Sequence, residues 1–219
     1  MKRFRIVCLW ICFALLGIIT HAQESGGRIV VIDPGHGGVD SGAFGVNGIK
    51  EKDIVLEVVK EMIRLNKELF DNEIEFYLTR YNDTLISLGD RTKLAKSLKP
   101  DVFISIHCNQ ATRKSAQGIE VYVPRPDAST DKELLFKSEE LAQRMLKEFR
   151  GSLDFKIRGL KYANFQVLRE TKNICSAVLL ELGFLSNREE AEHSRRKESV
   201  TGLAMVVLEV LNVFMRAHQ

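Results

Sequence analysis

The sequence predicts a single α/β domain built on a mostly parallel, twisted six-stranded sheet with helices on both faces. Short runs rich in Val, Ile, Leu, Phe or Tyr, which are typical of strands, alternate with longer segments of helical periodicity. This alternation favours a parallel sheet covered by helices. About 197 residues follow an N-terminal export-like segment, enough for one core, and no Pro-, Ser- or Gly-rich linker and no repeat divides them.

Six runs are expected to form strands because they are short and rich in β-branched or aromatic residues. They span 28–33, 74–80, 102–107, 118–123, 164–169 and 177–182. Four segments are expected to form helices, at 54–70, 85–98, 132–149 and 200–215. In the first of these, the apolar residues follow the 3.6-residue period of a helix that buries one side.

The first 22 residues predict an export signal. A basic start with Lys2, Arg3 and Arg5 precedes the apolar run 6–19 and small residues before a cleavage point at Ala22. Fourteen apolar residues are too few to cross a bilayer, which needs about 20. We therefore expect residues 23–219 to form the mature domain, exported to the periplasm or cell envelope, with no stable membrane anchor after signal removal.

Charge and cysteine content exclude some classes of function. The formal charge of +3 lies entirely in the first 22 residues, so the remaining chain is neutral and a nucleic-acid partner has no electrostatic support. Only Cys108 and Cys175 lie beyond that segment, and two cysteines make no disulfide framework. Both lie beside apolar runs and are expected as buried, unpaired thiols. We expect a monomer.

Four polar residues are predicted to meet at one rim of the sheet, because ligands bind open parallel sheets at the carboxyl ends of the strands. His36 follows the first strand in a glycine-rich turn, and His107 closes the third. Glu181 lies in the last strand, where a carboxylate costs several kcal/mol unless it is paired, hydrated or metal-bound. Glu51 opens the first long helix, where a carboxylate is favourable.

Two histidines and one carboxylate are a common catalytic zinc set, with the fourth position left for water and the second carboxylate as a candidate base. The spacing does not decide whether Glu51 or Glu181 is the third ligand. The glycines around His36 are expected to let the backbone turn sharply enough to aim its ring at the metal. The same turn fits neither the dinucleotide nor the P-loop phosphate-binding pattern.

Other polar residues are weaker candidates. His21 falls in the export signal, and His193 and His218 lie in polar or terminal stretches that favour a solvated surface. A second group follows the strand at 74–80 and enters the next helix, which allows either a clamp for an anionic substrate or structural ion pairs. The structural interpretation is favoured for this group, which comprises Arg80, Asp83 and Arg91.

The candidate residues occur in motifs that resemble the zinc-dependent N-acetylmuramoyl-L-alanine amidases, the catalytic family of cell-division and spore-wall amidases. The motifs follow one another over nearly all of the chain beyond residue 22: D-P-G-H-G-G at 33–38, E-K-D-I at 51–54, L-T-R at 78–80, S-I-H-C-N at 105–109, G-I-E-V-Y at 118–122 and L-E-L-G-F-L-S-N at 180–187. The resemblance implies that His36, Glu51 and His107 bind Zn²⁺ and that Glu181 is the catalytic acid/base.

The resemblance implies a peptidoglycan hydrolase that cleaves the amide between N-acetylmuramic acid and the L-alanine of the stem peptide. A zinc peptidase that cuts within the stem and a non-catalytic wall-binding module remain alternatives. Cys108 departs from the family, which usually has a small residue there, and the segment before Glu181 lacks a proline that the family often carries. Tyr122 and Asn164 are only 42 positions apart, too few for the inhibitory helix of some division amidases, so an open site is expected.

Overall fold

The computed structural model describes residues 28–218, so the predicted export signal lies outside the described part of the chain. The core is a six-stranded sheet with the strand order β2-β1-β3-β6-β4-β5. In chain order, the strands are β1 (Arg28–Pro34), β2 (Ile74–Leu78), β3 (Val102–Asn109), β4 (Ile119–Pro124), β5 (Ile157–Ala163) and β6 (Ser176–Phe184).

Four strands of the sheet, β1, β2, β3 and β6, run in the same direction. Strand β4 pairs with β6 in the antiparallel sense, and the edge strand β5 runs parallel to β4. The predicted mostly parallel sheet is therefore confirmed. One consequence matters for the site: the carboxyl ends of β1, β3 and β6 lie on the same rim as the amino end of β4.

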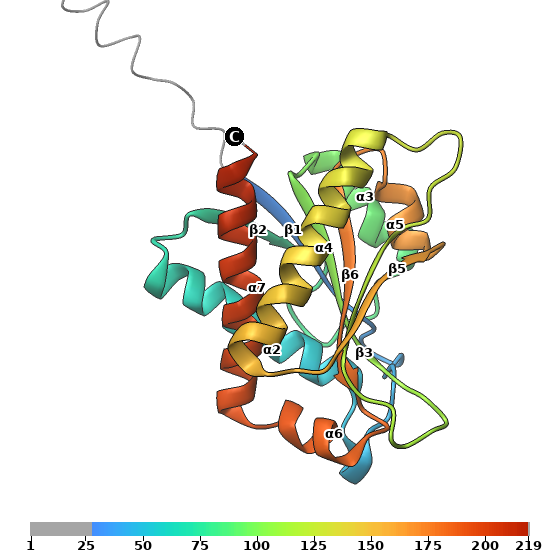
Figure 1. The fold of residues 1–219 in the computed structure, drawn as a ribbon, viewed down its shortest axis with the longest axis vertical. Helices are drawn as coiled ribbons and strands as arrows, with labels where there is room; N and C mark the ends of the chain where they lie inside the picture. Colours follow the sequence, from blue (N-terminus) through green and yellow to red (C-terminus); the bar gives the residue numbers. More distant parts are fainter. Residues whose placement is uncertain (1–27, 219) are drawn as a thin grey trace, which may run out of the picture.

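Helices cover both faces of the sheet, as predicted (Figure 1). Their bounds are α2 (Glu51–Leu69), α3 (Leu88–Leu98), α4 (Lys132–Leu153), α5 (Gln166–Thr171), α6 (Arg188–Ser194) and α7 (Lys197–Ala217), with a 3₁₀ turn, η1, at Val46–Gly48. Helices α2, α4 and α7 pack on one face and α3 and α5 on the other. Helix α3 begins after Ser87, whose hydroxyl accepts a hydrogen bond from the Asp90 N–H.

Strand β3 shows how the pleat divides the core. Val102, Ile104 and Ile106 are fully buried against the layer of α2, α4 and α7, as their spacing predicts. Burial of each such side chain contributes about 1.5–3 kcal/mol. Phe103 packs on the opposite face, under α3 and α5. His107 shares that opposite face because side chains alternate along a strand.

Helix α7 is long and apolar enough, by length and composition, to cross a membrane. It instead lies against α2 and α4 as part of the larger core, and 61% of its most apolar stretch is buried. We interpret α7 as a core helix of the domain.

The prediction of a strand at 164–169 is wrong. Residues in that stretch form the short helix α5, in which Val167, Leu168 and Thr171 are buried at helical spacing. The sixth strand is β5, just before it. As an edge strand, β5 contains charged residues and Gly159, whose φ of 104° favours glycine, so its composition does not resemble that of a buried strand.

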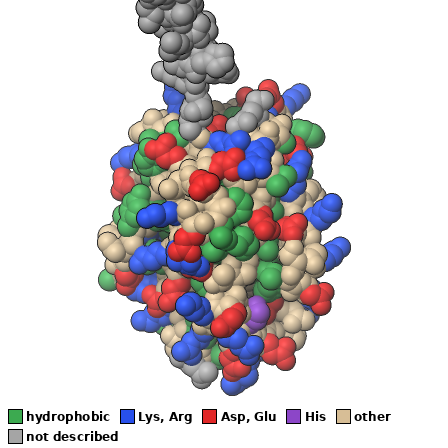
Figure 2. Space-filling model, turned by 90° about the vertical axis from the view of Figure 1, so that its left-hand side faces the viewer, with side chains coloured by type: hydrophobic (Ala, Val, Ile, Leu, Met, Phe, Trp, Pro, Cys, Tyr) green, Lys and Arg blue, Asp and Glu red, His purple; other side chains and the backbone are tan. Residues whose placement is uncertain are grey.

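Cys108 and Cys175 are both buried and free, as predicted. Burial raises the pKa of the Cys175 thiol to about 12 and also raises that of Cys108, so both behave as small apolar groups. On the face drawn in Figure 2, acidic and basic side chains are intermixed, without a broad patch of one sign. This distribution agrees with the zero net charge that the sequence predicts beyond residue 22.

Candidate active site

Three of the four predicted site residues form one compact group. One side-chain ligand atom from each of His36, Glu51 and His107 lies within 4.8 Å of the others. Glu51 Oε1 is central, 3.2 Å from His36 Nε2 and 2.8 Å from His107 Nδ1. Glu181 lies beside His107 in the register between β3 and β6. As predicted, residues from four distant segments therefore lie together at one rim of the sheet.

The turn that carries His36 is tightly constrained. His36 itself adopts a left-handed backbone with φ of 58°, which is uncommon for a residue other than glycine. Gly35 and Gly42 act mainly through size: a Cβ at Gly35 would overlap the His107 ring, and one at Gly42 would overlap the His36 ring and Glu51 Oε2. The glycines thus let two backbone segments approach the rings closely, besides shaping the turn.

Two buried arginines hold the same turn through its backbone carbonyls. Arg80 donates to the carbonyls of Pro34 and Gly35, and Arg91 donates to those of Pro34 and His36. Arg91 also pairs with the buried carboxylate of Asp33 at 2.6 Å. Both arginines are only 3% exposed. The expected structural ion pair is present for Arg91, whereas Arg80 forms no ion pair with the described residues and instead holds backbone carbonyls.

The remaining member of that group, Asp83, is half exposed and holds the tip of the same turn. It accepts hydrogen bonds from the Gly38 N–H at 2.7 Å and from Lys52 Nζ at 2.6 Å. Lys52 Nζ also donates to the Gly38 carbonyl at 2.8 Å. The loop is therefore tied to the first turn of α2, which presents Glu51.

Glu51 is held as an ionised group. Its Oε2 accepts from the Ala43 N–H at 2.8 Å, and its Oε1 accepts from the Cys108 N–H at 2.9 Å. Burial by itself raises the pKa of Glu51, but the hydrogen bonds and charges of His107 and His36 outweigh burial and lower that pKa well below its usual value. A carboxylate that stays ionised while buried is suited to bind a cation.

Asp40 is a site residue that the sequence reasoning missed. Its Oδ2 lies 2.9 Å from His36 Nδ1, so the other ring nitrogen, Nε2, faces Glu51. Its Oδ1 accepts from the Gly42 N–H. Carboxylates in this position orient metal-binding histidines. An acidic residue four positions after a loop histidine was the available signal, but it depends on the left-handed turn at His36.

The donor set fits a divalent metal ion. Two imidazole nitrogens and a carboxylate oxygen are ligands that such ions accept, and neighbouring ligands of one tetrahedral ion with bonds of about 2.0–2.1 Å lie about 3.3 Å apart. The observed separations of 3.2 and 2.8 Å around Glu51 Oε1 are close to that value. Among residues 28–218, these three residues form the one such group of His, Cys, Asp and Glu side chains.

Glu181 has the opposite environment to Glu51. Its Oε2 is buried and has no hydrogen-bond partner among the described residues. Burial is the main reason that the pKa of Glu181 is raised to about 7; the charge of His107 lowers it and that of Glu51 raises it. A carboxyl group with such a pKa both accepts and donates a proton near neutral pH.

The group opens into a cleft of about 530 Å³ on the α3 and α5 face of the sheet. His36, His107 and Glu181 line one part of it, and the other walls are largely apolar. These apolar residues are Leu85, Ile86, Leu88, Phe165, Val167 and Leu179. Within residues 28–218, the cleft leaves room for a ligand beside the candidate site.

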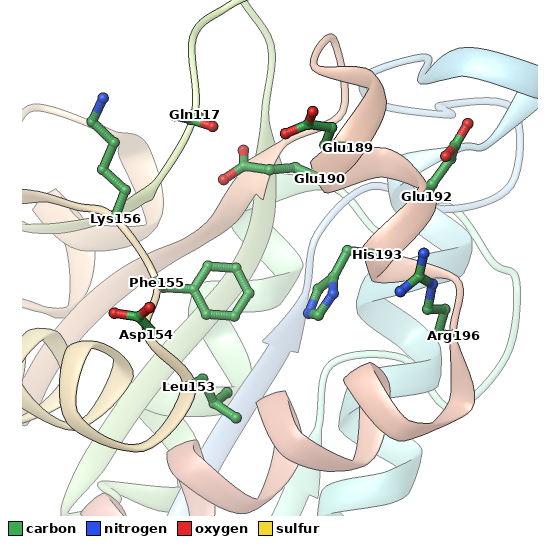
Figure 3. Close-up of a pocket in the computed structure, with 10 residues that line it drawn as sticks. All are labelled: Gln117, Leu153, Asp154, Phe155, Lys156, Glu189, Glu190, Glu192, His193 and Arg196. Carbon is green, nitrogen blue, oxygen red and sulfur yellow. The ribbon is translucent and has the colours of Figure 1, made fainter.

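A second hollow of about 490 Å³ lies between α6 and the segment that joins α4 to β5 (Figure 3). It contains His193, whose ring packs edge-on against that of Phe155 with 5.4 Å between the ring centroids and whose Nδ1 lies 3.2 Å from the Ser199 hydroxyl. His193 is partly buried, so the expectation of a solvated surface residue is too simple. None of the residues that line this hollow belongs to the candidate metal-binding group of His36, Glu51 and His107.

Residues 30–212 match the sequence profile of a family described as N-acetylmuramoyl-L-alanine amidase. This chain belongs to that family. The match includes the segments that carry His36, Glu51, His107 and Glu181. The family membership implied by the sequence motifs is thereby confirmed.

Known members of the amidase family are similar to this chain over part of their length. The amidase LytC of Bacillus subtilis strain 168 is 35% identical over 174 residues, which cover 80% of this chain and 32% of LytC. The amidase AmiA of Escherichia coli K12 is 45% identical over 102 residues, 46% of this chain and 34% of AmiA. The matched regions thus span about a third of these two amidases.

A solved structure of the family has the same fold. The catalytic domain of the amidase CwlV from Paenibacillus polymyxa var. colistinus superimposes with a TM-score of 0.75 at 32% sequence identity. The superposition covers 86% of this chain and 98% of that domain. The present chain therefore shares the fold of the CwlV catalytic domain.

Proposed function

We propose that this protein is a zinc-dependent N-acetylmuramoyl-L-alanine amidase that hydrolyses the amide between N-acetylmuramic acid and the L-alanine of the peptidoglycan stem. The observation that carries the proposal is that, in a chain of this family, the site contains two buried carboxylates with opposite environments. Glu51 contacts both histidines, and Glu181 beside them has a buried oxygen that has no hydrogen-bond partner among residues 28–218.

His36, Glu51 and His107 would hold the Zn²⁺ ion, through the atoms that converge on Glu51 Oε1. When bound there, Zn²⁺ supplies Lewis acidity, which polarises the scissile carbonyl and lowers the pKa of water. Glu181 takes a proton from the attacking water and then gives it to the leaving amine of L-alanine. Asp40 keeps the His36 ring oriented, with Nε2 toward the ligand group.

Digestion of purified sacculi tests the proposal and separates it from its two alternatives. An amidase releases stem peptides with a new L-alanine amino terminus and leaves intact lactyl groups on the glycan, which mass spectrometry of the fragments detects. A peptidase that cuts within the stem exposes other amino groups. A wall-binding module releases nothing, and the retention of the complete residue set in His36, Glu51, His107 and Glu181 argues against it.

We also propose that residues 1–22 direct export and are removed, so that residues 23–219 act on peptidoglycan in the periplasm or cell envelope as an unanchored monomer. The support is the charge and apolar pattern of that segment and the location of the substrate outside the cytoplasmic membrane. Amino-terminal sequencing of protein from the envelope fraction is expected to begin at Gln23. Recovery of a chain that still begins at Met1 would contradict export with cleavage.

A further inference from the structure

A group of polar residues on β4 and β5 extends the active-site rim beyond Glu181. At its centre Glu120 is 1% exposed, and each of its two carboxylate oxygens accepts two hydrogen bonds. Its Oε1 accepts from Arg158 Nε and from Lys161 Nζ. Its Oε2 accepts from the Tyr122 hydroxyl and from Asn109 Nδ2, each at 2.8 Å. The catalytic scheme above does not use this group.

The position of Glu120 places these residues beside the candidate catalytic carboxyl group. Glu120 is directly opposite Glu181 in the antiparallel pairing of β4 with β6, and opposite residues project from the same face. Lys161 is opposite Tyr122 in the next pairing, on β5. Because neighbouring strands are about 4.8 Å apart, Lys161 lies about two strand spacings from β6. The order across the rim is thus metal group, Glu181, Glu120 and then the two cations.

The two cations are accessible and have donors to spare. The side chains of Arg158 and Lys161 are 31% and 39% exposed. Lys161 has three N–H donors and gives one to Glu120, while Arg158 uses Nε and keeps both Nη groups free of hydrogen bonds to the described residues. The Arg158 guanidinium lies over the Phe184 ring at 4.9 Å, which fixes its plane.

The other carboxylate near Arg158 is already occupied. Glu190 accepts from the Gly118 N–H and from the Phe184 N–H, each at 2.7 Å. Because the hydrogen-bonding positions of Glu120 and Glu190 are filled, the donors that Arg158 and Lys161 leave unused are available to another acceptor. A carboxylate is the acceptor that cationic donors bind most strongly.

The direction in which the substrate lies follows from the proposed amidase reaction, on which this inference rests. Glu181 gives its proton to the leaving amine, so the first stem residue lies next to Glu181, whose cross-strand neighbour on the side of β4 is Glu120. The glycan next to the scissile amide carries no charge, whereas the second stem residue, D-glutamate, is linked through its side chain and keeps a free α-carboxylate. Two residues of chain reach at most about 7 Å, which brings this carboxylate toward the β5 cations.

We propose that Lys161 and Arg158 form a subsite for the free carboxylate of the second residue of the stem peptide. Lys161 Nζ and the Arg158 Nη groups donate to the carboxylate, and Glu120 holds both side chains in place. The Tyr122 ring, 5.2 Å from that of Phe165, joins this subsite to the wall of the cleft. The subsite makes the enzyme prefer stems with D-glutamate over stems in which that carboxylate is amidated to D-isoglutamine.

Two synthetic substrates test the subsite. Both carry a stem tripeptide on the same short glycan, one with D-glutamate and the other with D-isoglutamine at the second position. We expect the unchanged protein to favour the D-glutamate substrate by about tenfold in kcat/KM, mainly through KM, the effect of one partly exposed charge-assisted hydrogen bond. Lys161→Met is expected to remove most of this preference, and Lys161→Arg to retain it.

Lys156→Met is the matched control, because Lys156 lines the second hollow (Figure 3) and is expected to leave the preference unchanged. An equal loss of activity on both substrates in Lys161→Met would assign the lysine to support of Glu120 alone and overturn the subsite. The absence of any preference in the unchanged protein would overturn it as well, while leaving the amidase activity standing.

Binding of the product peptides tests the carboxylate subsite separately from the amidase activity. The stem tripeptide with D-glutamate is expected to bind the zinc-loaded protein about tenfold more tightly than the D-isoglutamine peptide, and Lys161→Met is expected to equalise them. If the protein hydrolyses neither substrate but still shows this difference in binding, the amidase proposal fails and the subsite stands. Equal binding of the two peptides would overturn the subsite.

Discussion

Glu51 and Glu181 are two buried carboxylates at the same rim of one sheet, yet their surroundings are opposite. Glu51 contacts both histidines and accepts from two backbone N–H groups, whereas Glu181 Oε2 has no partner among the described residues. Their pKa values move apart accordingly, down for Glu51 and up to about 7 for Glu181. Whether a buried carboxylate suits a metal ion or proton transfer therefore depends on its environment and not on the residue type.

The backbone around the two carboxylates differs in the same way. The Glu51 side is enclosed by the His36 turn, which buried arginines hold through backbone carbonyls. The Glu181 side faces the cleft and has the cross-strand neighbour Glu120. We therefore propose that the first region holds an ion and that the second admits a substrate.

The largest expected effect comes from removing a histidine from the Glu51 side. His36→Ala or His107→Ala deletes one of three protein ligands, and no other histidine lies in the metal-binding group. We expect metal analysis after dialysis to fall from about one zinc per chain to nearly none. His193→Ala, in the second hollow, is the matched control and should keep its zinc. Full zinc content in both ligand variants would disprove the assignment.

The second effect is a pH dependence of zinc binding. Burial lowers the pKa of His36, but the hydrogen bonds and charges of Glu51 and Asp40 outweigh it and raise the pKa to about 9. Zinc must displace this proton, so below that pH the apparent affinity falls about tenfold per unit, or about 100-fold from pH 8 to pH 6. Competition titrations with a chelator measure it. An affinity that does not change over this range would show that no proton is released from the site.

A smaller effect is expected from the residue that orients His36. Asp40→Asn removes the charge beside Nδ1 but keeps the shape of the side chain, and we expect zinc affinity to weaken about 10- to 100-fold. The control is Asp154→Asn, at the exposed carboxyl end of α4. If both variants bind zinc like the unchanged protein, Asp40 does not support the ligand group.

The smallest effect concerns the close approach of the backbone at Gly42. Gly42 and Gly48 have similar φ values of 62° and 73°, so Ala at either position costs about 1–2 kcal/mol of backbone strain. A Cβ at Gly42 also overlaps Glu51 and the His36 ring, whereas nothing lies within 4 Å of one at Gly48. We expect Gly42→Ala to lower the free energy of unfolding by about 1–3 kcal/mol more than Gly48→Ala. If denaturant titrations give equal losses of unfolding free energy for the two variants, a Cβ at Gly42 does not crowd Glu51 and the His36 ring.

The position of the site was predictable from sequence because it depends on strand order and polarity. His107 and Glu181 follow apolar runs that are typical of strands, and parallel strands bring their carboxyl ends to one rim. The choice between Glu51 and Glu181 as ligand was not predictable from spacing. It depends on hydrogen bonds from the Ala43 and Cys108 N–H groups, which form only when distant segments are packed together.

The errors in the sequence reasoning have a related cause. The sequence of β5 does not resemble a strand because an edge strand needs fewer apolar residues, and that of α5 does because Val167 and Leu168 are adjacent. Asp40 was missed because it reaches His36 only through a left-handed turn at that histidine. In each case the outcome depends on residues that are close in space, and the pattern of apolar residues does not reveal which residues these are.

The most direct test compares Glu51→Gln with Glu181→Gln, measuring zinc content and amide hydrolysis in both. Each change removes one charge and keeps the side chain's size, and Glu189→Gln at the second hollow is the control. We expect Glu51→Gln to lose zinc and activity together, whereas Glu181→Gln is expected to keep about one zinc and to lose activity by about 100- to 10,000-fold. Near-normal turnover in Glu181→Gln, or loss of zinc in both variants, would contradict the separate roles of the two carboxylates.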